Sequence, residues 1–198
     1  TVVAKELAGG YMKNLFNPAL FGRLFMISAF PGSLSPWRAP YDLVSTATPL
    51  GLMRSEQSMT SLGQLFLGTV PGSLGETSVL LIALGTAYLI YRRFVNWRIP
   101  VGVLGTVFVL TWLFGENPIF HLFSGSIMLG ACFMATDPAT SPRTQKGRWI
   151  CAIGIGVIVV AFRLWGWLPE GTTFGILAMN AAVPVINQYT KETKKQEA

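Results

Sequence analysis

Residues 149–169 read WICAIGIGVIVVAFRLWGWLP, a nearly unbroken apolar stretch in which Arg163 is the single charged residue. About 20 mostly apolar residues are enough for a helix to cross the hydrocarbon core of a bilayer. Of the chain's 198 residues, 51% are hydrophobic and 12% are charged, which is about half the charged share of a soluble domain. This composition predicts an all-α membrane protein surrounded by a lipid bilayer. It excludes a disordered chain, a disulfide scaffold and a nucleic-acid-binding module.

Similar apolar stretches lie on both sides of this one. They cover residues 78–91, 99–115, 117–136 and 171–190. Together with 149–169 they predict five transmembrane helices over residues 78–190. A shorter stretch, 17–32, contains Arg23 and is expected to be a tilted span or a half-helix packed inside the protein.

The charges between these stretches predict the orientation of the chain. Nine of the 15 lysine and arginine residues lie in three clusters, at 92–98, 143–148 and 191–195. The turns at the opposite ends of the stretches contain Glu116 and Glu170 and no lysine or arginine. Because cations collect on the cytoplasmic side of a membrane, the pattern predicts a cytoplasmic C-terminal tail at 191–198. It also places residues 32–77 on the outer side, or dipping into the membrane from it.

The segment before the first of these spans has a different character. Residues 63–78 read GQLFLGTVPGSLGETS, in which glycine and proline interrupt the apolar residues and Glu76 is the single charge. Irregular backbone at membrane depth survives where it is packed in protein or lines a cavity, and broken helices often hold a ligand or an ion. The segment is therefore predicted to be a broken or re-entrant helix with Glu76 as a binding residue. An ordinary exposed loop is the alternative.

The sequence contains no motif of a hydrolase, a kinase or a dinucleotide-binding enzyme. Cys132 and Cys151 lie in separate apolar stretches without a further ligand at metal-binding spacing. They are expected to be buried thiols, and a cluster shared with another subunit is the alternative. The single histidine, His121, is expected to be structural. The chain thus shows no catalytic residues, no complete active site and no metal site of its own.

Two charged residues in or near the ends of the spans each allow two interpretations. Asp137, in ATDPAT, is expected to cap the turn at 139–140, and ion conduction is the alternative. Arg163 is either a functional charge inside the membrane or a side chain that extends to the outer surface.

Residues 16–23, FNPALFGR, have the features of a helix start that binds an anion. Pro18 suits the first turn, and Asn17 can cap it. The free amides of such a start attract phosphate or carboxylate groups. Asn17 is therefore a candidate ligand-binding residue.

Residues 42–50 read DLVSTATPL, a run of small hydroxyl residues between an acid and a proline. The composition alone is typical of a turn. A threonine hydroxyl in such a run can also become a phosphoester, and the nearby acid can help to hold a metal–phosphate donor. The charge pattern places this segment on the outer side of the membrane.

This segment resembles the flavinylation motif Asp-x-x-Ser/Thr-x-Ala-Thr of the RnfD/NqrB family, whose members are membrane subunits of Rnf-type ion-translocating electron-transport complexes and of the sodium-pumping NADH:quinone reductase. In that family the last threonine carries FMN through a phosphoester bond. The resemblance implies covalent FMN on Thr48, with Asp42, Ser45, Thr46 and Ala47 completing the motif. Thr46 stands where the family usually has glycine.

Other segments resemble the same family in the same order. They read GGYMKNLFNPALFGRLF (9–25), GSLGETS (72–78), LGACFMATDPATSP (129–142) and EGTTFGILAMNAAVPVIN (170–187). The TSP at 140–142 favours the Rnf-type member over the quinone-reductase one. Family members have further N-terminal spans, and this sequence starts without Met, so we expect it to be a C-terminal portion of a longer chain.

The resemblance implies a fold and a function. The fold would be a multi-span helical bundle with broken helices, the second half of a urea-channel-like inverted repeat, in which residues 1–198 form one membrane domain. Within it, 32–77 would be the outer-side flavin-attachment loop and broken helix. The function would be electron transfer in an inner-membrane translocase that couples ferredoxin:NAD⁺ chemistry to Na⁺ or H⁺ movement.

The implied partners are the other membrane and peripheral subunits, including a second flavin-bearing one, and an external transferase that takes FMN from FAD. This transferase requires Thr48 to face outward. The family also implies a non-covalent riboflavin, bound near Asn17 or near the turn at 134–142. The alternative function is an ion or small-solute channel or transporter without a redox cofactor, and a purely structural scaffold is a third.

Overall fold

The structure is a computed structural model that describes residues 14–30, 48–54, 60–73, 75–166 and 171–190. Within these ranges the chain forms helices and turns and no strand, which confirms the predicted all-helical class. The elements are α1 (Pro18–Ala29), α3 (Pro49–Arg54), α4 (Leu62–Leu67), α5 (Val79–Tyr91), α6 (Arg98–Leu113), α7 (Pro118–Phe123), α8 (Ile127–Leu129), the π-helical η2 (Gly130–Met134), α9 (Gln145–Leu164) and α10 (Thr172–Tyr189).

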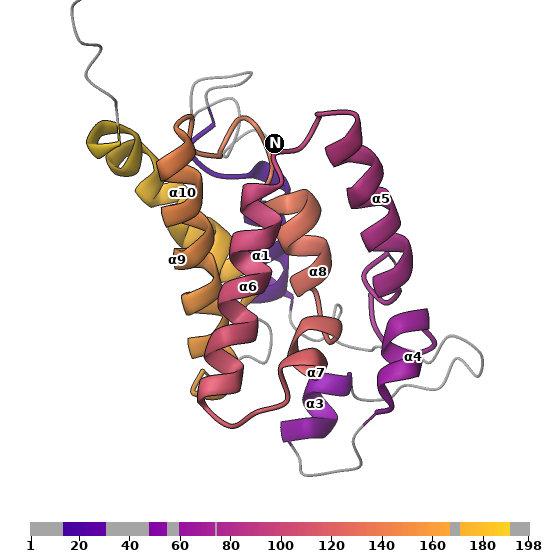
Figure 1. Cartoon of the computed structure of the whole chain (residues 1–198). Helices are drawn as coiled ribbons and strands as arrows, with labels where there is room; N and C mark the ends of the chain where they lie inside the picture. Colours follow the sequence, from indigo (N-terminus) through magenta and orange to yellow (C-terminus); the bar gives the residue numbers. More distant parts are fainter. Residues whose placement is uncertain (1–13, 31–47, 55–59, 74, 167–170, 191–198) are drawn as a thin grey trace, which may run out of the picture.

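The centre of the fold is the packing of α9 against α6 on one side and α10 on the other (Figure 1). Val103 and Val107 of α6 are completely buried against Ala152 and Val159 of α9. Small residues let these helices approach closely: a Cβ on Gly156 would lie 2.6 Å from Cβ of Thr106. Close contact through small residues is how helices associate where lipid removes the hydrophobic driving force between them.

The remaining elements surround this core. Leu20 of α1 and Ile127 of α8 are buried in the same cluster as α6, α9 and α10. Helix α5 stands to one side in Figure 1 and packs through Val79 and Ile82 against α8 and η2. The short helices α3, α4 and α7 lie together at one end of the molecule.

Four of the five predicted spans correspond to the helices α5, α6, α9 and α10. The prediction of a single helix over 117–136 is wrong. Residues 117–136 do not form one helix but break into α7, α8 and η2, with an irregular turn at 124–126. Asn117 caps α7 through hydrogen bonds from the amides of Ile119 and Phe120. Gly125 has φ +68°, a conformation that glycine adopts without strain and that ends the helical path.

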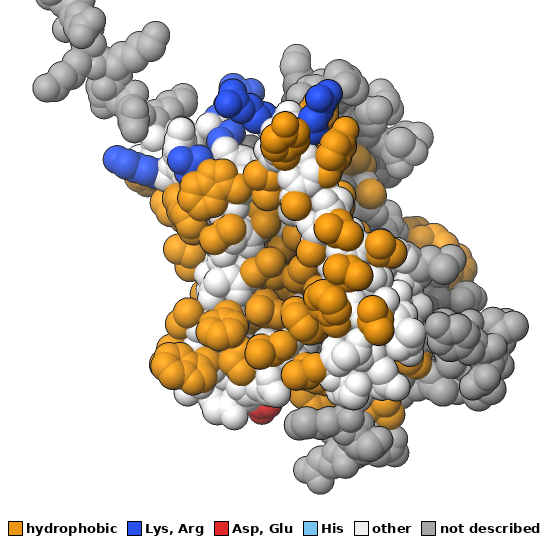
Figure 2. Space-filling model, turned by 45° about the vertical axis from the view of Figure 1, so that its right-hand side comes forward, with side chains coloured by type: hydrophobic (Ala, Val, Ile, Leu, Met, Phe, Trp, Pro, Cys, Tyr) orange, Lys and Arg blue, Asp and Glu red, His pale blue; other side chains and the backbone are white. Residues whose placement is uncertain are grey.

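Among the described helices, α9 alone is long and apolar enough to cross a membrane, judged by length and composition. Helices α1, α5 and α6 are apolar but shorter, with 12, 13 and 16 residues. Figure 2 shows hydrophobic side chains over much of one face, with lysine and arginine gathered at one end. That end holds the end of α5 and the starts of α6 and α9, so two of the three predicted cationic clusters lie together. The third, at 191–195, lies outside the described residues.

Both cysteines are buried, as predicted, and neither forms a disulfide. Cys132 lies in η2 against α5, and Cys151 lies in α9 within the central cluster. Within the described part of the chain, no three metal-binding side chains come together.

The glycines of α6 provide a test of this packing. A Cβ on Gly102 would lie 2.6 Å from Cβ of Ala152 in α9, whereas a Cβ on Gly105 would meet nothing within 4 Å. We expect Gly102→Leu to lower the free energy of unfolding by about 1–3 kcal/mol because it overpacks the α6–α9 contact. Gly105→Leu is the matched control and should leave stability nearly unchanged. Thermal unfolding of detergent-purified protein measures both, and equal melting temperatures would contradict this packing.

Candidate functional site

Thr48 begins α3 and caps it. Its carbonyl oxygen accepts a hydrogen bond from the amide of Leu52 (2.9 Å), and its Oγ1 accepts one from the amide of Gly51 (3.3 Å). Pro49 follows in the first turn, where its missing N–H costs nothing. The Thr48 side chain is half-buried, so it lies at the surface of the fold rather than in its core. The other predicted motif residues, Asp42, Ser45, Thr46 and Ala47, lie outside the described residues.

The residue that anchors Thr48 to the fold is Leu50. Its side chain is 3% exposed and packs with Leu65 of α4, Val70 and Phe120 of α7. A helix as short as α3 is not stable on its own, so tertiary contacts of this kind decide where it lies. The position of Thr48 therefore depends on the elements beneath Leu50.

A small cavity of about 20 Å³ lies beside Thr48, enough for about one water molecule. Its walls come from α3, α4, the segment after α4, and the turn after α7; they are Thr48, Pro49, Leu65, Val70, Pro71, Gly72, Glu76, Thr77, Phe123 and Gly125. We refer to it as the Thr48 cavity. It brings together Thr48 and Glu76, two of the predicted site residues.

Glu76 is 6% exposed and has partners on two sides. Its Oε1 accepts a hydrogen bond from the amide of Ser73 (3.2 Å), and its Oε2 lies 3.9 Å from Nη2 of Arg23 in α1. A buried carboxylate is tolerated when it is paired in this way. Glu76 thus closes the 73–76 turn and connects it to α1.

Within its described residues, the segment 63–78 is interrupted after α4 and is buried only in part. Helix α4 ends at Gly68, which has φ +91° and whose Cβ, if present, would lie 2.8 Å from the backbone of Ser78. Leu65, Val70 and Glu76 are buried, whereas Leu67 is 62% exposed and Gly75 is also exposed. Three buried side chains therefore anchor a segment that otherwise lies largely at the surface.

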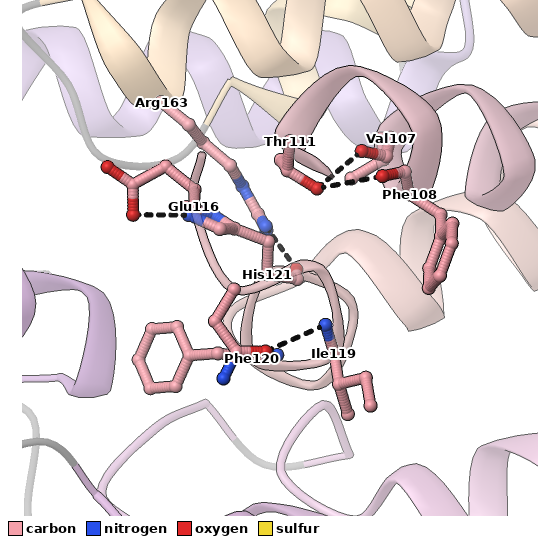
Figure 3. Close-up of polar contacts among 9 residues, drawn as sticks. Val107, Phe108, Thr111, Glu116, Ile119, Phe120, His121 and Arg163 are labelled. Carbon is pink, nitrogen blue, oxygen red and sulfur yellow. Dashed lines mark hydrogen bonds and ion pairs between the residues drawn. The ribbon is translucent and has the colours of Figure 1, made fainter. Parts of the chain in front are cut away.

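Arg163 is buried near the end of α9, with 3% of its surface exposed, so the second of its two interpretations, a side chain that extends to the outer surface, is wrong. Its guanidinium donates to two backbone carbonyls at the end of α7: Nη1 to His121 O (Figure 3), and Nη2 to Ser124 O at 2.9 Å. These carbonyls lie where α7 stops and lack partners within the helix, and a cation near a helix C-terminus is stabilising.

His121 itself is completely buried, in agreement with the expected structural role. Its Nε2 lies 3.8 Å from Oε2 of Glu116, and its ring meets Phe120 edge-on (Figure 3). The arginine, histidine and glutamate therefore meet where α6, α7 and α9 end or begin.

A second and larger cavity lies where the chain enters α1. Its volume is about 800 Å³. It is lined by the segment before α1, the turn after η2 and the end of α10: Asn14, Leu15, Pro138, Ala139, Ser141, Arg143, Val183, Pro184, Asn187 and Gln188. We refer to it as the amide cavity. The turn after η2 and the end of α10, which line it, lie at the end of the molecule opposite α3 and α7 (Figure 1).

Asn17 connects the start of α1 to the chain beside this cavity. Its Oδ1 accepts hydrogen bonds from the amides of Ala19 (3.0 Å) and Leu20 (3.4 Å), which confirms the predicted cap, and its Nδ2 donates to Met134 O (3.4 Å). Asn17 is itself buried, and Asn14, one turn earlier, lines the cavity instead. The two alternatives for a second ligand site, Asn17 and the turn at 134–142, therefore describe one region.

Asp137 caps its turn as predicted. Its Oδ1 accepts from the amide of Ala139 (3.2 Å), and its Oδ2 accepts from Oγ1 of Thr140 (3.0 Å). The wall of the amide cavity is further fixed by a hydrogen bond from the amide of Arg143 to Oδ1 of Asn187 (3.0 Å). These hydrogen bonds fix the turn after η2 and its contact with the end of α10, which form part of the cavity wall.

The sequence matches known proteins over most of its length. The model of the NQR2, RnfD, RnfE family matches residues 1–196. The chain is 42% identical to the D subunit of the proton-translocating ferredoxin:NAD⁺ oxidoreductase complex of Clostridium ljungdahlii, over 97% of this chain and 64% of that protein. It is 44% identical to the D subunit of the Na⁺-translocating ferredoxin:NAD⁺ oxidoreductase complex of Acetobacterium woodii, over 96% and 62%.

A third relative, the D subunit of the ion-translocating oxidoreductase complex of Stutzerimonas stutzeri, is 38% identical over 96% of this chain and 65% of its own length. The chain therefore spans 62 to 65% of the length of these curated relatives. The family match extends over nearly the whole sequence and covers every element described above. The chain belongs to the NQR2, RnfD, RnfE family.

Proposed function

We propose that the chain is an electron-transfer subunit that carries FMN as a phosphoester on Thr48. It would act in a membrane complex that couples electron transfer between ferredoxin and NAD⁺ to the movement of Na⁺ or H⁺. The observation that carries the proposal is the position of Thr48: the last residue of the DLVSTAT segment is half-buried at the start of a helix that is itself anchored by Leu50.

The hydrogen bonding of Thr48 is compatible with an ester. In its bond to the amide of Gly51 the Thr48 oxygen accepts. Esterification removes the hydroxyl hydrogen and leaves an oxygen that still accepts, so the cap on α3 can persist. The Thr48 cavity, at about 20 Å³, has room for about one water molecule, so the FMN attached to Thr48 would lie outside this cavity.

The relatives support the redox part of the proposal. Two of them are named as components of proton- or Na⁺-translocating ferredoxin:NAD⁺ oxidoreductase complexes. A flavin supplies electron transfer when it is bound, while the protein supplies its position and surroundings. We assign the NAD⁺ and ferredoxin steps to other subunits, including a second flavin-bearing one, because the sequence contains no motif for either.

The arrangement of charges supports an orientation in the inner membrane. Two of the cationic clusters lie at the end of the molecule opposite α3 and α7 (Figures 1 and 2). With the cationic end in the cytoplasm, Thr48 faces outward, where an external transferase that uses FAD reaches it. The amide cavity then faces the cytoplasmic side.

We further propose that the amide cavity holds the non-covalent flavin, riboflavin. Its volume of about 800 Å³ falls within the range of about 300–1,000 Å³ that is typical of small-molecule sites. Leu15, Pro138 and Val183 offer apolar surface to a ring, and the amides of Asn14 and Gln188 match the carbonyl and N–H groups at a flavin's edge. The residues present therefore fit this group.

A channel or transporter without a redox cofactor is the second candidate function. The buried broken segments around Glu76 and at 124–126 favour it, because such breaks also form transport sites. Covalent flavin on Thr48 distinguishes the two functions, because the electron-transfer subunit would carry it and the channel or transporter would not.

Replacing Thr48 tests the attachment site. Thr48→Asn keeps an oxygen that caps α3, since asparagine is a strong capping residue, but it removes the hydroxyl that forms the ester. We expect the full-length protein, co-expressed with the transferase, to give a flavin-fluorescent band in a denaturing gel and Thr48→Asn to give none. Thr77→Val, at a second threonine of the Thr48 cavity, is the control and should keep the band. A fluorescent Thr48→Asn band would contradict the assignment.

Replacing Asn14 tests the amide cavity. Asn14→Leu leaves a polar edge of the ligand unpaired, which costs about 1–3 kcal/mol, or roughly 5- to 150-fold in affinity. We expect the riboflavin extracted per chain from purified protein to fall accordingly, while covalent flavin on Thr48 is unchanged. Asn96→Leu, at the same end of the molecule but outside the cavity, should retain riboflavin. Equal riboflavin content in both variants would place the flavin elsewhere.

A further inference from the structure

We propose that Arg163 is a positioning residue for the acceptor threonine: it fixes the end of α7 and the following turn, and these form the surface on which Leu50 and Thr48 rest. This inference builds on the proposed attachment of FMN to Thr48. It assigns a role to a residue of α9, a helix that contributes nothing to the walls of the Thr48 cavity.

The first step is the burial of Arg163. An arginine that is 3% exposed in apolar surroundings is destabilising unless its N–H groups are bonded. Two of its nitrogens donate to backbone carbonyls, one to that of His121 (Figure 3) and one to that of Ser124. The guanidinium and the end of α7 therefore satisfy one another, and moving either one leaves buried polar groups without partners.

The second step is the dependence of α7 on this contact. Helix α7 has six residues, too few to be stable alone. Its last carbonyls have no partner within the helix, and a cation at a helix C-terminus is stabilising. Arg163 therefore determines where α7 ends and where the chain turns toward α8.

The third step runs from this turn to Thr48. Gly125 lies between Arg163 and α3: a Cβ there would be 3.4 Å from Nη2 of Arg163 and 2.6 Å from Cδ1 of Leu50. Phe120 of α7 also packs in the cluster that buries Leu50. Leu50 is two residues from Thr48, in the same first turn of α3. A shift of the turn therefore reaches the acceptor hydroxyl through a single side chain.

The reaction at Thr48 is sensitive to such a shift. In the proposed transfer, Oγ1 of Thr48 forms a bond to the FMN phosphorus of FAD, and the phosphorus–oxygen bond to the AMP half breaks. AMP leaves with the electron pair of that bond, and the hydroxyl proton passes to solvent. The transferase supplies the FAD, so this chain contributes the placement of one oxygen, and a misplacement of about 1 Å in a reacting group costs up to about 100-fold in rate.

The experiment measures the rate of flavin attachment to the full-length protein, using purified transferase and FAD. We expect Arg163→Met to slow attachment at least about tenfold without changing the KM for FAD, because FAD binds the transferase. Arg163→Lys keeps a buried cation that can donate and should restore part of the rate. Arg148→Met is the matched control: Arg148 also lies in α9 and donates to a carbonyl, that of Pro142, but at the opposite end of the helix. It should react like the wild type.

A merely structural role gives a different pattern, in which Arg163→Met and Arg148→Met lose attachment and thermal stability in parallel. That result would overturn the inference, as would attachment to Arg163→Met at the wild-type rate. If Arg163→Met does not fold, Gly125→Ala replaces it, since the added methyl presses on Leu50 while Arg163 remains in place. Wild-type attachment to Gly125→Ala would equally overturn it. Failure of the wild-type protein to accept flavin would instead overturn the proposed function, and this inference with it.

Discussion

Where a buried helix breaks, the amides and carbonyls that it frees must find partners inside the protein. This constraint governs the two regions to which we assign function. Arg163 takes the carbonyls at the end of α7, Glu76 takes the amide of Ser73, and Asn17 bonds both to the start of α1 and to the carbonyl of Met134. These three polar side chains lie within a largely apolar fold, and each one fixes an irregular segment beside a cavity.

Helix α1 connects the two cavities. Asn17 lies at its start, beside the amide cavity, and Arg23 in its middle pairs with Glu76 in the wall of the Thr48 cavity. The elements that line the two cavities lie toward opposite ends of the bundle (Figure 1). The central packing of α6, α9 and α10 holds α1 in place through Leu20.

Features that depend on local sequence were predictable. Apolar length located α5, α6, α9 and α10, and the Asn17 cap and the Asp137 turn follow from neighbouring residues. The break at 124–126 is not predicted from the sequence, because the Ser-Gly-Ser at these positions lies inside a stretch whose apolar content indicates one continuous helix. The role of Arg163 depends on which carbonyls α9 meets, and tertiary packing alone decides that. The sequence indicates only that a single arginine lies near the end of an apolar stretch, which marks Arg163 as unusual but does not identify its partners.

The most direct test of the central claim is mass spectrometry of the peptide that contains Thr48, from full-length protein produced with its transferase. Our account predicts a phospho-riboflavin adduct localised to Thr48 by fragmentation. An unmodified Thr48 peptide, from protein whose transferase is shown to be active on another acceptor, would contradict it and favour a permeation protein instead.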